Sequence, residues 1–222
     1  MVAVNKTSGI SIGGDRWDES KERLDRLLEK ELEIPKIYTI HRIDRDTSGL
    51  VIFARTREVH RSLSVLFEQR KIEKRYIAIV HGRPSWKETV CELPLVPNGN
   101  KKHMTIIDKY HGKKSLTHFL LISATGNYSV LEVKPETGRI HQIRVHAAAL
   151  GHPVVCDNLY GKEKPVMLSS IKRGWRGDPL EERPILARLG LHALEIKLPD
   201  GQIFSAPLAR DMSALVKQMG KL

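Results

Sequence analysis

One short polar segment, residues 41–49, carries side chains that could do acid–base or nucleophilic chemistry. It reads His-Arg-Ile-Asp-Arg-Asp-Thr-Ser-Gly and runs directly into the apolar stretch at 50–54. Asp44 has Arg42 and Arg45 beside it in sequence, and nearby cations favour the ionised form of a carboxyl group. An ionised aspartate can act as a nucleophile or as a general base. The residues alone also allow Asp44 to be a surface ion-pair partner beside a turn at 46–49.

The elements that must position this segment can be read from hydrophobic periodicity. An apolar strand at 50–54 is expected to be central in a sheet, and such a strand would hold the polar loop at its start in place. Helical repeats of apolar side chains occur at Leu24/Leu27/Leu28/Leu32 within 17–33, at Val59/Leu63/Leu66/Phe67, at Ile140/Ile143/Ala147/Leu150, and at Leu208/Met212/Leu215/Val216/Met219. Further strands are expected at 75–80, 116–122, 128–134, 191–198 and 202–206, the last two joined by a Pro-Asp-Gly turn. Because strands and helices do not alternate regularly, this order predicts an α+β fold with a mixed, mostly antiparallel sheet and flanking helices.

The charge balance indicates a polyanionic partner. The chain of 222 residues has 37 Lys and Arg against 26 Asp and Glu, a formal net charge of +11. This balance fits a nucleic-acid-binding protein, although a charge that serves solubility is the alternative. Two segments rich in basic residues, 98–114 and 162–188, could meet phosphates or could be solvated loops. Aromatic residues make up 5% of the chain, which argues against a general single-strand binder built on many stacking platforms.

Several classes of protein and site are disfavoured. No apolar run has the length of a membrane helix, and residues 1–14 lack the pattern of a secretory leader. Cys91 and Cys156 form no Cys-x-x-Cys pair, so a disulfide framework is not expected. His141 and His146 are five positions apart, on different faces of a helix, and no bound metal is expected. These observations predict a cytoplasmic protein that does not bind membranes.

Residues 41–49 carry a resemblance to a known family. The segment resembles the active-site motif of RNA pseudouridine synthases of the large-ribosomal-subunit type, with Ile43 where that family has Leu. The stretches 5–9, 74–78, 138–146 and 150–161 are similar to further motifs of the family, and 191–193 with 204–207 to its final hairpin. The resemblance spans residues 2–211. One departure is Thr7, which stands where the family usually has Pro.

The resemblance implies particular roles for these residues. Asp44 would be the catalytic residue, Tyr76 would stack on the flipped uracil, and Arg144 would hold the charge and orientation of Asp44. The RNA-contacting or loop-supporting residues would be His41, Arg42, Thr47, Arg139, His141 and Gln142. Tyr76 shares one strand face with Ala78 and Val80, so the residues alone also allow a core role for it. The family uses no cofactor, because the reaction breaks and re-forms bonds within one nucleotide.

The resemblance also predicts an organisation and a substrate class. Residues 1–222 are expected to form one catalytic domain, with no separate N-terminal RNA-binding domain. A central cleft would cross the sheet, with Asp44 at its floor and the two basic segments at its rim. The expected protein is a monomer that isomerises uridine in ribosomal or transfer RNA. The alternatives are a non-catalytic RNA-binding or ribosome-assembly protein on the same fold, and a hydrolase that uses Asp44 with His41.

Overall fold

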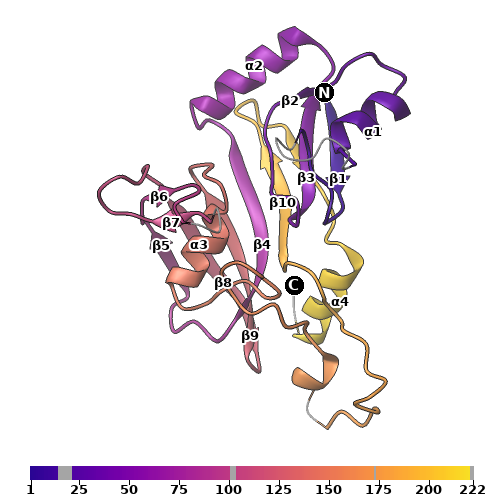
Figure 1. Cartoon of the computed structure of the whole chain (residues 1–222), viewed down its shortest axis with the longest axis vertical. Helices are drawn as coiled ribbons and strands as arrows, with labels where there is room; N and C mark the ends of the chain where they lie inside the picture. The colour runs from indigo at the N-terminus through magenta and orange to yellow at the C-terminus, as the bar shows by residue number, and fades with distance from the viewer. Residues whose placement is uncertain (15–21, 101–103, 173, 221–222) are drawn as a thin grey trace. The chain divides into compact units, whose positions relative to one another are not determined.

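The structure is a computed structural model that describes residues 1–14, 22–100, 104–172 and 174–220. Backbone contacts divide the chain into two compact units. The first consists of Met1–Lys74 with His192–Pro207, and the second of Arg75–Leu191 with Leu208–Leu222. Each unit combines a β-sheet with α-helices, which confirms the α+β class (Figure 1). Among the described residues, no helix is long and apolar enough to cross a membrane.

The first unit is built around a fully buried strand. Strand β3 (Ser48–Ala54) pairs antiparallel with β1 (Val2–Lys6) on one side and parallel with β10 (Leu191–Lys197) on the other. Two short strands extend this sheet: β2 (Tyr38–Thr39) pairs with β3, and β11 (Ile203–Ser205) with β10. All seven residues of β3 are buried. The expectation that 50–54 forms a central strand is therefore confirmed.

Two helices accompany this sheet. Helix α1 spans Leu24–Glu31, inside the expected segment 17–33, whose residues 17–21 lie outside the described part of the chain. Helix α2 spans Arg57–Glu68 and begins at Thr56, whose hydroxyl accepts the Val59 N–H. The apolar stripe of α2 packs against a core that includes Leu50, Ile52 and Ile196. The continuous apolar run of the sequence thus identified β3 as a buried strand, and the helical periodicity identified the buried face of α2.

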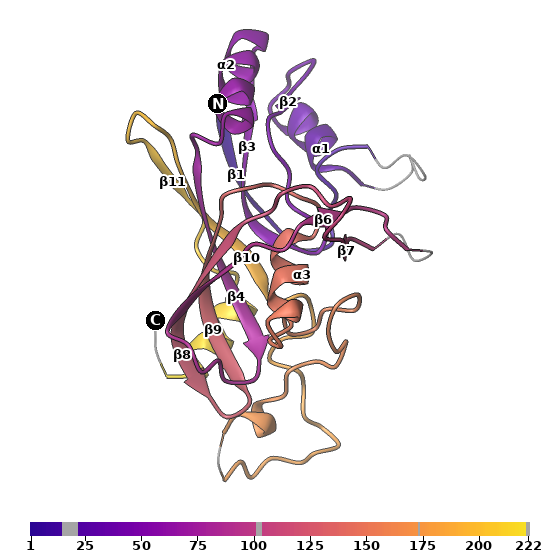
Figure 2. The ribbon, with the colours of Figure 1, turned by 90° about the vertical axis from the view of Figure 1, so that its left-hand side faces the viewer.

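The second unit contains an antiparallel sheet in the order β4–β9–β8–β5. Its strands are β4 (Glu73–His81), β5 (Glu88–Cys91), β8 (Thr117–Thr125) and β9 (Tyr128–Pro135). The β8–β9 hairpin turns at Gly126, and these long strands are seen along their length in Figure 2. A separate two-stranded sheet joins β6 (Leu95–Val96) to β7 (Ile106–Ile107). The expected strands at 75–80, 116–122 and 128–134 are confirmed, each slightly longer than predicted.

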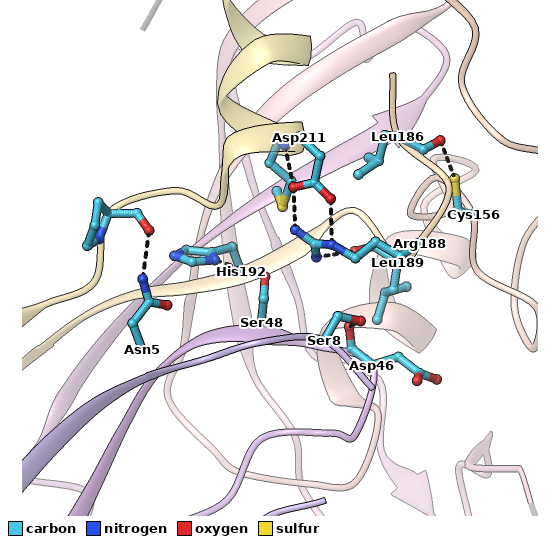
Figure 3. Close-up of polar contacts among 12 residues, drawn as sticks. Asn5, Ser8, Asp46, Ser48, Cys156, Leu186, Arg188, Leu189, His192 and Asp211 are labelled. Carbon is cyan, nitrogen blue, oxygen red and sulfur yellow. Dashed lines mark hydrogen bonds and ion pairs between the residues drawn. The ribbon is translucent and has the colours of Figure 1, made fainter. Parts of the chain in front are cut away.

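The helices of the second unit are α3 (Gln142–Ala149) and α4 (Arg210–Gln218). Helix α3 contacts β8 and β9, and its Ile143 and Ala147 pack in the core of this unit. Helix α4 buries Met212, Leu215 and Val216. Its Asp211 carboxylate accepts hydrogen bonds at 2.7 and 2.6 Å from Arg188, which precedes β10 (Figure 3).

Several elements carry no strong sequence signal. Strands β1, β5, β6 and β7 were not predicted, because strands of two to five residues are too short to show a clear hydrophobic pattern. Segment 98–114 was expected to be a loop, yet it contains β7, which pairs with β6. Segment 162–188 contains a short 3₁₀ helix, Leu168–Ser170, and a bridge between Val166 and Leu186. Backbone pairing orders parts of both basic segments in a way that hydrophobic patterning does not reveal.

The close contact between β3 and β10 leaves no room for a side chain at Gly49, and this can be tested. Gly49 has φ of +110°, and an added Cβ would collide with the carbonyl oxygen of Ala193 on β10. Gly201 has φ of +88° with nothing within 4 Å. We expect Gly49→Ala to lower the free energy of unfolding by about 4 kcal/mol or more, and Gly201→Ala by about 1–2 kcal/mol. Urea unfolding of both variants checks this expectation, and equal losses would contradict it.

Candidate active site

Asp44 lies in the loop that leads into β3. Its side chain is partly buried, and its carbonyl oxygen accepts the Thr47 N–H at 3.2 Å. That bond closes a tight turn over residues 44–47, which ends directly before Ser48, the first residue of β3. Arg42 and Arg45 are exposed on either side of Asp44. The loop therefore presents one carboxylate from a turn that is fixed to a buried strand.

A buried lysine holds this loop from the first strand. Lys6 ends β1 and is 2% exposed. Its Nζ donates hydrogen bonds to the carbonyl oxygens of Thr7, Ile10 and Arg45 at 2.9, 2.9 and 2.7 Å. A buried ammonium is costly unless its protons are all used, and three carbonyl acceptors satisfy that requirement. Lys6 thereby joins the turn after β1 to the residue that follows Asp44.

Backbone and hydroxyl groups reinforce the same junction. The Gly9 N–H donates to the Arg45 carbonyl at 2.9 Å, and the Arg45 guanidinium returns a bond to the Gly9 carbonyl at 2.8 Å. The Ser8 hydroxyl donates to the Asp46 carbonyl at 2.7 Å (Figure 3). We call residues 6–10 and their bonds to 45–46 the loop clasp. Its contacts fix the backbone on the C-terminal side of Asp44.

A buried histidine fixes the beginning of β3. The Ser48 hydroxyl lies 2.9 Å from Nδ1 of His192 (Figure 3), and Nε2 of His192 lies 3.2 Å from the carbonyl oxygen of Ala206. Because a carbonyl can only accept, Nε2 carries the proton and Nδ1 accepts from Ser48. Ser48 and His192 are both fully enclosed. This chain of bonds connects the motif at 41–49 to β10 and to the segment that follows β11.

The His41 side chain makes its contacts with residues of the first unit. Its ring stacks on Phe67 with a centroid separation of 4.8 Å, and its Nε2 accepts the Ile52 N–H at 2.9 Å. Burial and, to a lesser degree, Lys74 lower the pKa of His41 to about 3. The imidazole is therefore neutral at physiological pH. Thr47 is also buried, and among the described residues its hydroxyl has no hydrogen-bond partner.

The start of α3 contains the other expected site residues. His141 precedes the helix in a left-handed conformation with φ of 55°. Gln142 is buried: its Oε1 accepts the Thr137 hydroxyl at 2.6 Å and the Arg139 N–H at 3.0 Å. Its Nε2 donates to the Leu116 carbonyl and to the Thr117 hydroxyl oxygen, each at 2.9 Å. The polar atoms of Gln142 thus all serve to hold the loop 137–141 on the edge of β8.

Arg144 forms a buried ion pair with a residue that sequence reasoning did not single out. Its Nε and Nη2 donate to the two carboxylate oxygens of Asp157 at 2.8 and 2.7 Å, and the two side chains are 3% and 0% exposed. Burial alone would raise the pKa of Asp157, but Arg144 and the N–H groups of Leu159 and Tyr160 outweigh it and lower that pKa. The bidentate geometry sets the plane of the guanidinium.

Tyr160 adds a second support for Arg144. The guanidinium carbon lies 5.2 Å from the centre of the Tyr160 ring, within cation–π range. The Tyr160 hydroxyl accepts the Thr105 N–H at 2.8 Å and lies 2.9 Å from Nδ1 of His141. Burial raises the pKa of Tyr160, so the hydroxyl stays protonated at physiological pH. One tyrosine therefore connects Arg144, the start of α3 and the segment that contains β7.

Tyr76 lies on β4, paired in register with Val133 of β9. It is partly buried and packs against a core that includes Ala78, Val80 and Leu131. The expected strand face is therefore confirmed. A ring with one side in the core and an exposed remainder can be both a packing residue and a platform for a base.

The expected site residues fall into two groups. Those of the first unit are His41, Arg42, Asp44 and Thr47, and those of the second are Tyr76, Arg139, His141, Gln142 and Arg144. The supporting residues that sequence reasoning missed are Lys6, Ser48, Asp157, Tyr160 and His192. All of them lie inside stretches that were singled out as family-like. Their polar character within these stretches was the available signal. Which residue bonds to which follows only from the three-dimensional structure.

Comparison with known proteins identifies the class. Residues 1–149 match the family model described as RNA pseudouridylate synthase. The chain is 36% identical over 185 residues to ribosomal large subunit pseudouridine synthase D of Zymomonas mobilis, covering 81% of this chain and 55% of that protein. It is 37% identical over 220 residues to ribosomal large subunit pseudouridine synthase C of Buchnera aphidicola, covering 95% of this chain and 65% of that protein. The chain therefore belongs to the RNA pseudouridylate synthase family.

Further matches agree on family and fold. The dual-specificity RNA pseudouridine synthase RluA of Escherichia coli is 34% identical over 161 residues, 72% of this chain and 73% of that protein. The solved structure of human RNA pseudouridylate synthase domain containing 1 superposes with a TM-score of 0.72 at 26% identity, covering 96% of this chain and 82% of that one. The chain spans 55% and 65% of the lengths of the Zymomonas and Buchnera relatives.

The loop clasp can be tested by removing its ammonium. We expect Lys6→Met to lower the free energy of unfolding by about 3 kcal/mol, because three carbonyl groups lose a charged donor. The amide protons of Gly9 and Thr47 should exchange faster as the loop loosens. Urea unfolding and hydrogen exchange measure the two effects. The matched control is Lys71→Met, an exposed lysine of the same unit, which should change stability by about 0.5 kcal/mol or less. Equal effects of the two substitutions would contradict the clasp.

The neutral state of His41 predicts a pH dependence of stability. The unfolded chain binds a proton at this residue below its ordinary pKa of 6.5, whereas the folded chain resists until about 3. Stability is therefore lost as pH falls through this window, by at most about 1.4 kcal/mol per pH unit. In His41→Gln, whose amide oxygen can accept the Ile52 N–H, the loss below pH 6.5 should be smaller. Urea titrations at a series of pH values measure the difference, and parallel curves for the two proteins would contradict it.

Proposed function

We propose that the protein is an RNA pseudouridine synthase that isomerises uridine in structured ribosomal or transfer RNA, with Asp44 as the catalytic residue. The observation that supports this most directly is the environment of Asp44. The chain belongs to the family, and its Asp-containing motif leads into a buried strand while the loop clasp fixes the residues after Asp44. Such support is what a catalytic carboxylate requires, because small displacements of a reacting group cost large factors in rate.

The chemistry follows from the reaction. Pseudouridine formation breaks the bond between C1′ and N1, turns the uracil, and forms a bond between C1′ and C5. The proton on C5 is lost and N1 gains one, so the product is an isomer and no external group is transferred. The uridine must first leave its stack, at a cost of a few kcal/mol that is least in a loop. Asp44 then acts as nucleophile or base on the extruded nucleotide.

Two residues of the second unit are assigned supporting roles in the same reaction. Tyr76 stacks on the uracil, and its hydroxyl helps to move the C5 proton. Arg144 supplies the positive charge that orients the Asp44 carboxylate. The rigid bidentate pair with Asp157 supports this assignment, since a guanidinium held in one plane loses no freedom when it meets a second carboxylate. In this proposal both units act as one catalytic domain.

The remaining expected residues divide by what they touch. Arg42 is exposed and Arg139 partly so, and we assign to them contacts with RNA phosphate. His41, Thr47 and Gln142 are assigned to loop support, because they are enclosed by the fold or bonded within it. His141 joins Tyr160 and supports the start of α3. This assignment moves four residues from RNA contact to positioning.

The relatives indicate the class of RNA. Two are named for the large ribosomal subunit, and a third is named a dual-specificity RNA enzyme. The net charge of +11 fits a polyanionic substrate of either kind. We propose a cytoplasmic monomer that needs no cofactor, since the isomerisation is redox-neutral.

The deciding experiment compares pseudouridine maps. Ribosomal and transfer RNA from a strain lacking the gene is labelled with carbodiimide and read by primer extension, then compared after complementation. Wild type should restore a lost site, and Asp44→Asn should not, while its RNA affinity and unfolding midpoint stay close to wild type. The matched control is Asp200→Asn, the same change at an exposed turn, which should restore the site. Restoration by Asp44→Asn would reject the assignment.

Purified protein on RNA from the deletion strain extends the test. Arg144→Ala and Tyr76→Phe should bind RNA while forming pseudouridine at least about tenfold more slowly. RNA binding without isomerisation by wild type would instead indicate a non-catalytic binding protein. Free uracil or chain cleavage would indicate a hydrolase.

A further inference from the structure

A tyrosine of the second unit is displayed to solvent on a basic turn. Tyr110 is 92% exposed, an unusual state for a large aromatic side chain. It belongs to the segment 98–114, which contains five lysines and one acidic residue, Asp108. The mechanism proposed above does not use Tyr110. An exposed aromatic ring among positive charges has the composition of a nucleic-acid contact.

The turn that carries Tyr110 is held by hydrogen bonds. The Asp108 carboxylate accepts the N–H groups of Tyr110 and His111 at 2.8 and 3.0 Å. The Asp108 N–H donates to the Pro94 carbonyl at 3.1 Å, and the Gly112 N–H donates to the Asp108 carbonyl at 2.9 Å. The N–H groups of His111 and Tyr110 lower the pKa of Asp108, so its acceptor role persists at physiological pH. The backbone under Tyr110 is therefore fixed before any partner arrives.

The turn is also anchored to the segment around Arg144. Leu95 and Lys113 exchange two backbone hydrogen bonds, at 3.0 and 2.9 Å. The Thr105 N–H donates to the hydroxyl of Tyr160, the residue whose ring lies against Arg144. The segment that carries the turn is thus bonded to Tyr160, whose ring lies against a residue assigned to catalysis.

A second turn in the same unit provides a comparison. Leu180 is 95% exposed, and its N–H donates to the Asp178 carboxylate at 2.8 Å, the same local geometry as at Tyr110. Its neighbours Glu181 and Glu182 are acidic, whereas Tyr110 has Lys109 and His111 beside it and Lys113 nearby in sequence. Exposure and the bond from the backbone N–H to an aspartate carboxylate are matched, and the charge is opposite. A polyanion would favour the first turn and be repelled by the second.

We propose that the turn 108–111 is an RNA-docking site at which Tyr110 stacks on an unpaired base and the neighbouring lysines bind phosphates. This rests on the proposed function for its substrate class, RNA. A base in a loop can offer its face to the ring, whereas bases inside a duplex are stacked on one another. The site selects RNA with unpaired nucleotides, without reading base identity.

The test separates docking from chemistry. All proteins carry Asp44→Asn, so no measurement depends on turnover, and a failure of the proposed isomerisation leaves the docking result readable. The probes are a stem–loop RNA with 5-iodouridine in its loop and a blunt duplex of the same stem sequence. Affinity is measured over a series of salt concentrations, and photocrosslinked protein is digested and analysed by mass spectrometry.

Specific outcomes are expected for each variant. Tyr110→Ala should weaken stem–loop binding by about 5- to 50-fold and leave duplex binding unchanged, and Tyr110→Phe should bind like the parent. Lys109→Ala should weaken both probes and reduce the salt slope by about one. Leu180→Ala, the matched control, should change neither probe. The crosslinked peptide should contain Tyr110.

Three results would overturn the proposal. They are unchanged stem–loop affinity in Tyr110→Ala, equal losses for the stem–loop and the duplex, and crosslinks that lie elsewhere in the chain. Because Tyr110 is exposed, its substitution should leave the unfolding midpoint unchanged, so loss of the fold does not explain a positive result.

Discussion

The first unit depends on the burial of one positive charge. The ammonium of Lys6 reaches three carbonyl oxygens, two in the turn after β1 and one in the loop that presents Asp44. An unpaired ammonium at this position would be costly to bury, so the three carbonyl groups must stay where they are for the fold to be stable. The requirement of one side chain thereby fixes two backbone segments that are 39 residues apart. The loop that presents Asp44 receives its order from this constraint, without regular secondary structure of its own.

The second unit solves a comparable problem with an ion pair. Arg144 and Asp157 are both buried, and such a pair is stable only when its remaining donors and acceptors are satisfied. The N–H groups of Leu159 and Tyr160 donate hydrogen bonds to the Asp157 carboxylate, and the Tyr160 ring lies against the guanidinium of Arg144. The hydroxyl of that ring then binds the backbone of Thr105. In both units a buried cation organises irregular backbone, which is why the residues assigned to catalysis can lie in loops and at a helix start.

The sequence predicted the elements that bury apolar side chains. Strand β3, helix α2 and the β10–β11 hairpin were identified because their apolar residues are periodic or their turn residues are distinctive. Strand β1 was missed, since alternate residues of Val2–Lys6 are exposed and the strand ends in a lysine. Burial of Lys6 arises from tertiary contacts with residue 45, which local pattern does not encode. Family-like motifs marked the site, but a motif does not tell which of its polar residues hold the loop.

The same reasoning explains the reassignment of His41 and Gln142. Both are polar residues in motifs, where contact with RNA is a natural expectation. Their ring or amide atoms are instead bonded to Ile52, Leu116, Thr117 and Thr137. Whether a polar side chain in a motif faces solvent or the protein depends on the packing of neighbouring strands. Exposed Arg42 differs because its long side chain has no such enclosure.

The parallel pairing of β3 with β10 has a consequence for biosynthesis. Ser48 and His192 are 144 residues apart, yet their hydrogen bond closes the start of the central strand of the first unit. During translation the ribosome releases β1, β3 and α2 long before β10, so an edge of β3 waits without its partner while the second unit is made. Loop closure over this distance delays completion of the sheet. Nascent chains would therefore complete the sheet around β3 late, and the interval is one in which the open strand edge is vulnerable to mispairing.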